Sequence, residues 1–128
     1  MQSTWRGSGL ILVIDDDTAV LQVAKLILER FGFSVQTAPS GRDGVAFYAG
    51  HVGQVRCVLL DMTMPDWNGE ETFRRLREVD PNAKVILTSG YSESQATDEL
   101  DKTGLAGFLQ KPYQVATLIE AVKAVVGE

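Results

Sequence analysis

The chain alternates between short apolar runs and longer amphipathic stretches. Runs of about five mostly aliphatic residues, bounded by polar or turn residues, are typical of strands buried on both faces of a sheet. The expected strands are 10–14 (LILVI), 33–37 (FSVQT), 55–61 (VRCVLLD), 84–88 (KVILT) and 106–110 (AGFLQ). The second run alternates apolar and polar residues, which predicts a strand near a sheet edge with one wetter face.

The intervening stretches carry apolar residues at helical spacing. Asp17 or Thr18 can cap the first helix, and Ser40 the second. In the first helix the residues at helical spacing are Val20, Val23, Ala24, Ile27, Leu28 and Phe31. In the third, over 70–79, the residues expected to face inward are Phe73, Leu76 and Val79. The other helices are expected within 39–50, at 92–104, where the pattern is polar, and from Val115 to Val126.

Strand and helix therefore alternate five times, which predicts right-handed βαβ crossovers and an α/β fold with a parallel sheet covered on both faces. A chain of 128 residues has room for one such domain. We place it at 9–128 and interpret residues 1–8 as a loose linker or lead-in, which we leave out of the fold.

Ligands of open parallel sheets bind at the carboxyl ends of the strands, so the residues at these ends are the candidates for function. Acids follow the first strand and end the third, and a hydroxyl and an amine follow the fourth and fifth. These residues are Asp15, Asp16, Asp17, Asp61, Ser89 and Lys111.

Carboxylates gathered at one edge repel each other unless a cation intervenes. Mg²⁺ prefers oxygen ligands, which Asp15, Asp16, Asp61 and the backbone carbonyl of Thr63 could supply. A metal ion together with Lys111 would neutralise the oxygens of a phosphoryl group. Aspartyl phosphates are known covalent intermediates, and Asp61, at the centre, is the natural acceptor.

Charge and composition exclude some functions. The formal net charge is −5, which argues against nucleic-acid binding by this chain. No apolar stretch approaches the roughly 20 residues needed to cross a bilayer, so no membrane contact is expected. The single cysteine, Cys57, lies in an apolar run and favours a reducing, intracellular setting.

Four segments together resemble the receiver domain of bacterial two-component response regulators. They are ILVIDDD (11–17), LLDMTMPDWNG (59–69), ILTSGYSE (86–93) and LQKPY (109–113). Each is weak alone, but all four stand in order, each at the end of the expected strand. The resemblance extends from Leu10 to about Val126 and implies a flavodoxin-like strand order of 2-1-3-4-5.

The resemblance implies that Asp61 accepts a phosphoryl group from a histidine kinase or a histidine phosphotransfer domain. Asp15 and Asp16 would hold Mg²⁺ (or Mn²⁺), and Lys111 would grip the phosphoryl group, often next to a cis bond before Pro112. Ser89 matches the hydroxyl switch residue.

Phe108 matches the aromatic switch residue, although it lacks the hydroxyl of the more familiar tyrosine. Thr63 and Tyr91 fall at positions that tune how long the phosphate survives. Trp67, in the loop after Asp61, is expected at the surface or in a partner contact.

The family also implies that this domain is not an enzyme beyond its own phosphorylation and slow autodephosphorylation. Phosphorylation would alter the face formed by helix four, strand five and helix five, where family members often pair as homodimers. The domain would act in the cytoplasm, alone or on the cytoplasmic side of a membrane-bound parent such as a hybrid histidine kinase.

Three other functions share parts of this pattern. A degenerate receiver would act only as a protein-docking module, which the intact set of site residues argues against. An aspartate-nucleophile phosphatase needs a second acid where this chain has Thr63. A nucleotide-binding switch needs a phosphate-binding loop of the form GxxxxGK[ST], which the chain lacks.

Overall fold

A computed structural model describes residues 5–90 and 105–127 of the chain. Its centre is a five-stranded sheet in the order β2-β1-β3-β4-β5, with every neighbouring pair parallel. The strands are β1 Leu10–Ile14, β2 Ser34–Ala38, β3 Val55–Asp61, β4 Val85–Ser89 and β5 Leu105–Gln110. The predicted fold class and strand order are confirmed, and β2 lies at a sheet edge as expected.

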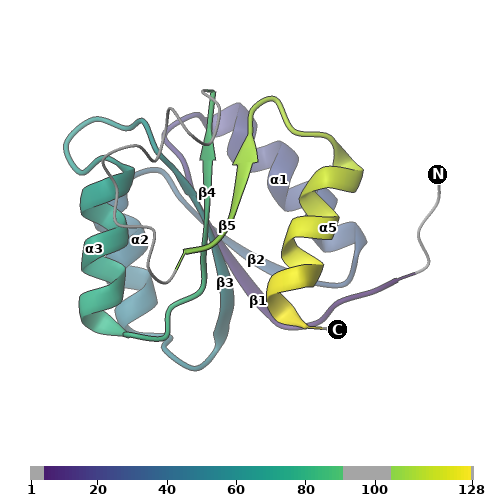
Figure 1. Cartoon of the computed structure of the whole chain (residues 1–128), viewed down its shortest axis with the longest axis horizontal. Helices are drawn as coiled ribbons and strands as arrows, with labels where there is room; N and C mark the ends of the chain where they lie inside the picture. The colour runs from purple at the N-terminus through teal and green to yellow at the C-terminus, as the bar shows by residue number, and fades with distance from the viewer. Residues whose placement is uncertain (1–4, 91–104, 128) are drawn as a thin grey trace.

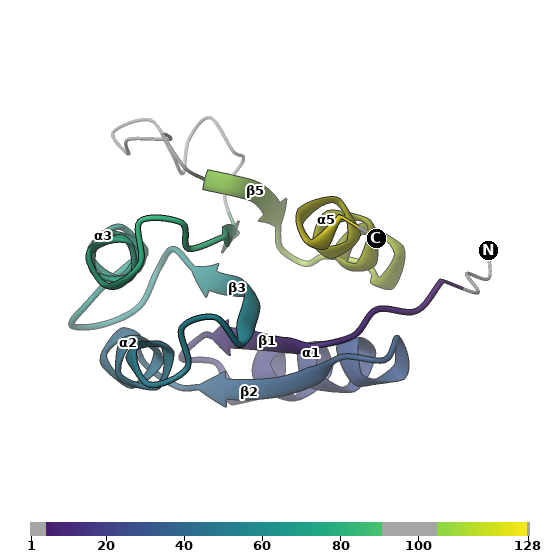
Figure 2. The same cartoon turned by 90° about the horizontal axis from the view of Figure 1, so that it is seen from below.

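Helices cover both faces of the sheet. Within the described residues they are α1 Thr18–Arg30, α2 Gly41–Ala49, α3 Gly69–Val79 and α5 Val115–Val126. Figures 1 and 2 show α1 and α5 on one face, and α2 and α3 on the other. Each face has its own apolar core, one including Ile11, Leu28 and Leu118 and the other Leu12, Leu60 and Leu76. None of these helices is long and apolar enough to cross a membrane.

Three expectations lie wholly or partly outside the described residues: the helix at 92–104, the face that this helix would form with strand five and helix five, and the position of Tyr91. The strand boundaries differ slightly from the predicted ones. β2 and β4 each begin and end one residue later, and β5 begins one residue earlier. The later end of β4 brings Ser89 into the strand, where it pairs with Gln110.

The inward face of α1 was partly mispredicted. Its buried residues are Leu21, Ala24 and Leu28, whereas Val23 is 53% exposed. Polar residues occupy one side of the helix (Thr18, Gln22, Lys25 and Glu29), and the remaining sides are apolar. Spacing alone therefore did not identify the stripe that faces the sheet. In α3, Phe73 and Leu76 are buried as expected, but Val79 is 38% exposed because it ends the helix.

The segment before β1 packs on the domain, in contrast to the loose lead-in expected for residues 1–8. The Trp5 ring lies 5.8 Å from that of Phe33, and the Lys123 amine lies 5.5 Å from the Trp5 ring. The Gly7 N–H donates to the Phe31 carbonyl at 2.7 Å. We call residues 5–8 the N-terminal strap. It joins the end of α1 to the last turns of α5.

Candidate functional site

The two central strands deliver two acids to one point. Asp15 directly follows β1, Asp61 is the last residue of β3, and these strands are neighbours in the sheet. Both acids are buried, with exposed fractions of 2% and 5%. A buried carboxylate needs a counter-charge or hydrogen-bond donors, so two of them side by side predict a specific partner.

Lys111 is that partner. Its Nζ donates to Asp15 Oδ2 at 2.7 Å and to Asp61 Oδ1 at 3.0 Å. Lys111 directly follows β5, and its own N–H donates to the Ser89 carbonyl at 2.6 Å, which fixes the start of its loop to β4. The Lys111–Pro112 peptide bond is cis. The sheet therefore brings together residues that are 50 and 96 positions apart in the sequence.

The environment shifts the acidities of this group. Burial raises the pKa of Asp61 above its ordinary value, and the nearby Asp15 charge acts in the same direction. The hydrogen bond and charge of Lys111 and the Thr63 N–H lower it, but they only partly offset the burial. Burial lowers the pKa of Lys111, yet its bonds to Asp15 and Asp61 outweigh this and raise it overall, so the amine stays charged.

The acids fit a hard divalent cation. Asp15, Asp16 and Asp61 each offer a carboxylate oxygen, and these oxygens lie within 4.8 Å of one another. One ammonium group cannot neutralise three carboxylates, and an all-oxygen donor set suits Mg²⁺ or Mn²⁺. Asp17 has a different task, because its side chain caps α1 by accepting from the N–H groups of Ala19 and Val20.

The loop between Asp61 and α3, residues 62–68, borders the acids. The Thr63 N–H hydrogen-bonds the Asp61 carboxylate, while the threonine residue is exposed. The loop closes where the Gly69 N–H donates to the Met62 carbonyl at 2.9 Å. A Cβ at Gly69 would lie 2.6 Å from the Met62 Cα, so the close approach requires glycine here.

Of the two expected switch residues, Ser89 is the one bonded to the site, through its carbonyl and the Lys111 N–H. Ser89 ends β4 and is 1% exposed. Phe108 lies on β5 opposite Leu87 and packs, partly buried, against the core under α2 and α3. The buried hydroxyl and the partly buried ring thus lie on adjacent strands, two register positions apart.

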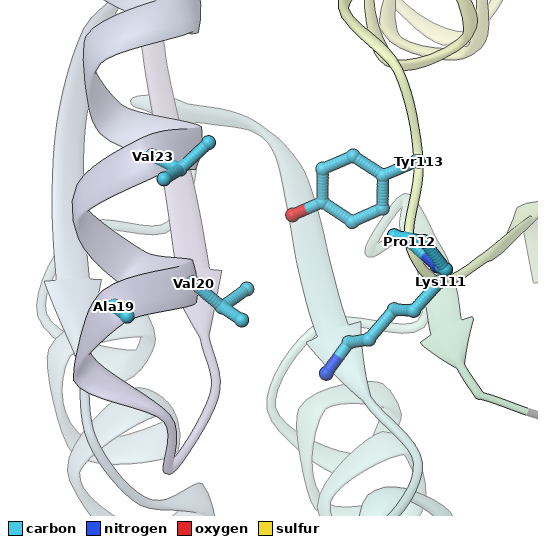
Figure 3. Close-up of a pocket in the computed structure, with 6 residues that line it drawn as sticks. All are labelled: Ala19, Val20, Val23, Lys111, Pro112 and Tyr113. Carbon is cyan, nitrogen blue, oxygen red and sulfur yellow. The ribbon is translucent and has the colours of Figure 1, made fainter.

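An apolar hollow opens next to Lys111, with a volume of about 420 Å³. Figure 3 shows Val20 and Val23 of α1 on one side of it and Pro112 and Tyr113 on the other, with the Lys111 amine at its lower end. Sequence reasoning did not identify Tyr113 or this hollow. The run of apolar residues on α1 was the available signal, but it was assigned to the core.

Comparison with known proteins agrees with this geometry. The family model of the response regulator receiver domain matches residues 11–123. The chain is 32% identical over 117 residues to the sensor kinase CckA of Brucella abortus, which covers 91% of this chain and 12% of CckA. It is 31% identical over 116 residues to the chemotaxis protein CheY of Thermotoga maritima, covering 90% of this chain and 95% of CheY.

Among solved structures, a CheX–CheY–BeF3–Mg²⁺ complex from Borrelia burgdorferi matches with a TM-score of 0.85 and 29% identity, covering 91% of this chain and 88% of the other. Receiver domains bind Mg²⁺ at an acidic pocket and act as regulatory rather than enzymatic domains. The chain spans most of CheY but only a small part of CckA. The acids lie at the carboxyl ends of the strands, an edge that we call the rim. The fold, this acidic rim and the matched family model together show that the chain belongs to the response regulator receiver domains of two-component signalling.

Proposed function

We propose that this receiver domain takes a phosphoryl group on Asp61 from a phosphohistidine donor, on a histidine kinase or a histidine phosphotransfer domain. The observation that carries the proposal is the bridge from Lys111 Nζ to both Asp15 and Asp61. A lysine held between two buried acids keeps a positive charge beside the acceptor oxygen. A domain that served only for docking has no need of this arrangement.

In the transfer, a carboxylate oxygen of Asp61 forms a bond to phosphorus. The bond between phosphorus and the donor imidazole nitrogen breaks, and its electron pair stays with the imidazole. Lys111 neutralises the phosphoryl oxygens, and the Thr63 N–H stays directed at the Asp61 carboxylate. A Mg²⁺ or Mn²⁺ ion held by Asp15, Asp16, Asp61 and the Thr63 carbonyl would supply further positive charge for those oxygens.

The new acyl phosphate changes the balance between two packings. The Ser89 hydroxyl turns toward the phosphoryl oxygens, and Phe108 rotates into the space that Ser89 leaves. Shifting such an equilibrium from 1:99 to 99:1 takes about 5.5 kcal/mol of differential stabilisation. A few charge-assisted hydrogen bonds are of that size. The face along β5 and α5 then changes for the downstream partner, or for a second copy of the domain.

The donor protein is proposed to contact the apolar hollow beside Lys111. A donor imidazole must reach Asp61 within bonding distance, so the surface around that imidazole must cover the rim. Val23 on α1 is 53% exposed and offers apolar surface for this contact. The acids at the rim then remain free to interact with the ion and the phosphoryl group.

The proposal is tested by intact-mass measurement after incubation with acetyl phosphate and Mg²⁺. We expect one added phosphoryl group on the wild-type chain and none on Asp61→Asn. An unchanged wild-type mass would favour the docking-only alternative, and an equal gain in both proteins would move the acceptor elsewhere. Turnover of a phosphate ester by the chain would instead favour the phosphatase alternative.

A further inference from the structure

Trp67 lies in the loop between Asp61 and α3, sandwiched between two guanidinium groups. The centre of the Arg42 guanidinium is 4.5 Å from the Trp67 ring, and that of Arg75 is 4.6 Å away. Arg42 belongs to the first turn of α2, and Arg75 to α3. One half-buried side chain thus binds the loop to both neighbouring helices.

Each arginine of the sandwich is also held by a carboxylate. Arg42 pairs with Asp66, which precedes Trp67, and Arg75 donates to Glu71 at 2.6 Å. Asp66 has a φ of 66°, a left-handed conformation that non-glycine residues rarely adopt. Asp adopts this conformation more readily than most residues, and the Arg42–Asp66 ion pair fixes the side chain of Asp66 to α2.

Two further hydrogen bonds connect the Trp67 end of the loop to the residue beside the acceptor. The Thr72 hydroxyl donates to the Trp67 carbonyl at 3.3 Å, and Thr72 is fully buried. The Gly69 N–H donates to the carbonyl of Met62, which is the neighbour of Asp61. A displacement of the loop at Trp67 therefore reaches the residues next to the acceptor.

We propose that Trp67 is a positioning residue for the cation site. It holds residues 62–68 in the conformation in which the Thr63 carbonyl and the Asp61 carboxylate can bind the same ion. The inference rests on the proposed function, because the ion is the one assigned there. If only a fraction of molecules has the competent loop, the apparent affinity for the ion falls by that fraction.

The first test is Mg²⁺ binding by calorimetry to the full chain and to Trp67→Ala. An exposed cation–π contact corresponds to a factor of about two to five in an equilibrium, and Trp67 makes two of them. We expect the Kd for Mg²⁺ to rise by about two- to tenfold in Trp67→Ala, and Trp67→Phe, which keeps a ring, to recover most of it. Trp5→Ala is the matched control, because Trp5 also contacts a cation but belongs to the N-terminal strap.

A second readout needs no metal. Hydrogen exchange at the Gly69 amide, measured in the presence of a chelator, reports whether the loop stays closed. We expect faster exchange in Trp67→Ala and in Arg75→Ala. Arg74→Ala should leave the rate unchanged, because Arg74 also pairs with Glu71 but does not contact Trp67. Unchanged Gly69 exchange in Trp67→Ala would overturn the positioning role.

The outcomes separate the two proposals. If the wild-type chain binds no Mg²⁺, the proposed cation site fails and the role of Trp67 fails with it. If the wild type binds and Trp67→Ala binds as tightly as Trp5→Ala, only the positioning role is overturned. Should Trp67→Ala not fold, Arg42→Ala removes half of the sandwich at an exposed residue, and an unchanged Mg²⁺ Kd in that variant has the same meaning.

Discussion

At the rim, the negative charges of the acidic side chains outnumber the positive charge that Lys111 supplies. Asp15 and Asp61 are almost fully buried, Asp16 is exposed, and Lys111 bonds to both buried acids. Burial raises the pKa of Asp61 even though Lys111 opposes it, so the carboxylate is less stable than in water. A residue in this condition gains from any incoming positive charge.

A second polar pair lies away from the rim and stabilises the packing of α2 on α3. The buried Tyr48 hydroxyl donates to Asp80 Oδ2 at 2.7 Å, and this bond lowers the pKa of Asp80. We expect Tyr48→Phe to reduce the free energy of unfolding by about 0.5–1.5 kcal/mol at pH 7. A carboxylate with a lowered pKa stabilises the fold above its unfolded pKa, and that contribution disappears as pH falls through the folded value.

The difference between Tyr48→Phe and wild type should therefore shrink in urea unfolding between pH 5 and pH 2. The matched background is Asp80→Asn, which keeps an acceptor for Tyr48 but cannot titrate. There the effect of Tyr48→Phe should not vary with pH. A loss of equal size at pH 7 and pH 2 in the wild-type background would contradict the account.

At the scale of elements, α1 has two apolar stripes with different tasks. Leu21, Ala24 and Leu28 pack on the sheet, while Val20 and Val23 line the hollow beside Lys111. Both stripes are aliphatic, and the polar residues Gln22, Lys25 and Glu29 occupy a third side of the helix. The stripe of Val20 and Val23 is available for the donor contact proposed above.

A charge on the exposed stripe should separate docking from chemistry. We expect Val23→Glu to slow phosphotransfer from a phosphorylated histidine kinase that labels the wild-type chain by about tenfold, which corresponds to about 1.4 kcal/mol of lost contact. Labelling by acetyl phosphate should stay unchanged, because a small donor needs no docking surface. Radiolabel transfer over time gives both rates.

The control is Val52→Glu, which places the same charge at a valine that is 46% exposed and lies outside the hollow. It should transfer at the wild-type rate with either donor. Equal slowing of both variants would show a general effect of added negative charge, and the hollow would lose its proposed role.

For the whole molecule, the N-terminal strap joins parts that the sheet does not connect directly. Trp5 contacts Phe33 before β2 and Lys123 in α5, and Arg56 donates to the Ser8 carbonyl at 2.7 Å and to the Val126 carbonyl at 3.0 Å. These contacts lie at the amino ends of the strands, away from the acids. The strap should therefore contribute to stability without affecting the chemistry.

We expect Trp5→Ala to lower the free energy of unfolding by about 1–2 kcal/mol, through lost aromatic and cation contacts. Urea unfolding measures this loss, and Trp5→Phe should restore part of it. Acetyl phosphate labelling of Asp61 in folded Trp5→Ala should match the wild type. An unchanged unfolding midpoint would mean that the strap contacts add nothing to the stability of the fold.

Patterns in the sequence predicted the sheet and its rim better than they predicted contacts between helices. Buried strands such as 55–61 are recognisable because their apolar runs are continuous, and an acid at the end of such a run is conspicuous. The meeting of Asp15, Asp61 and Lys111 at one edge was predicted from the rule for parallel sheets, whereas the double bridge from Lys111 to both acids was not.

The contacts of Trp5 and Trp67 were not predictable in the same way. Each depends on cations from helices that are distant in sequence, and no spacing rule links Trp67 to Arg42. Glycine is required where the strap meets the end of α1. Gly32 has a φ of 99°, and a Cβ there would lie 2.4 Å from the Gly7 carbonyl oxygen. Their role became visible only when the backbone was in place.

The strap also determines how such a domain can be attached to other proteins. Trp5 and the last turns of α5 meet at one pole, and the seven-residue strand β3 carries the acceptor Asp61 to the other. Further sequence joined at the pole of the strap leaves the acidic rim at the opposite pole accessible to a donor protein. The domain can therefore occur by itself or as part of a much longer polypeptide while the residues around the acceptor stay the same.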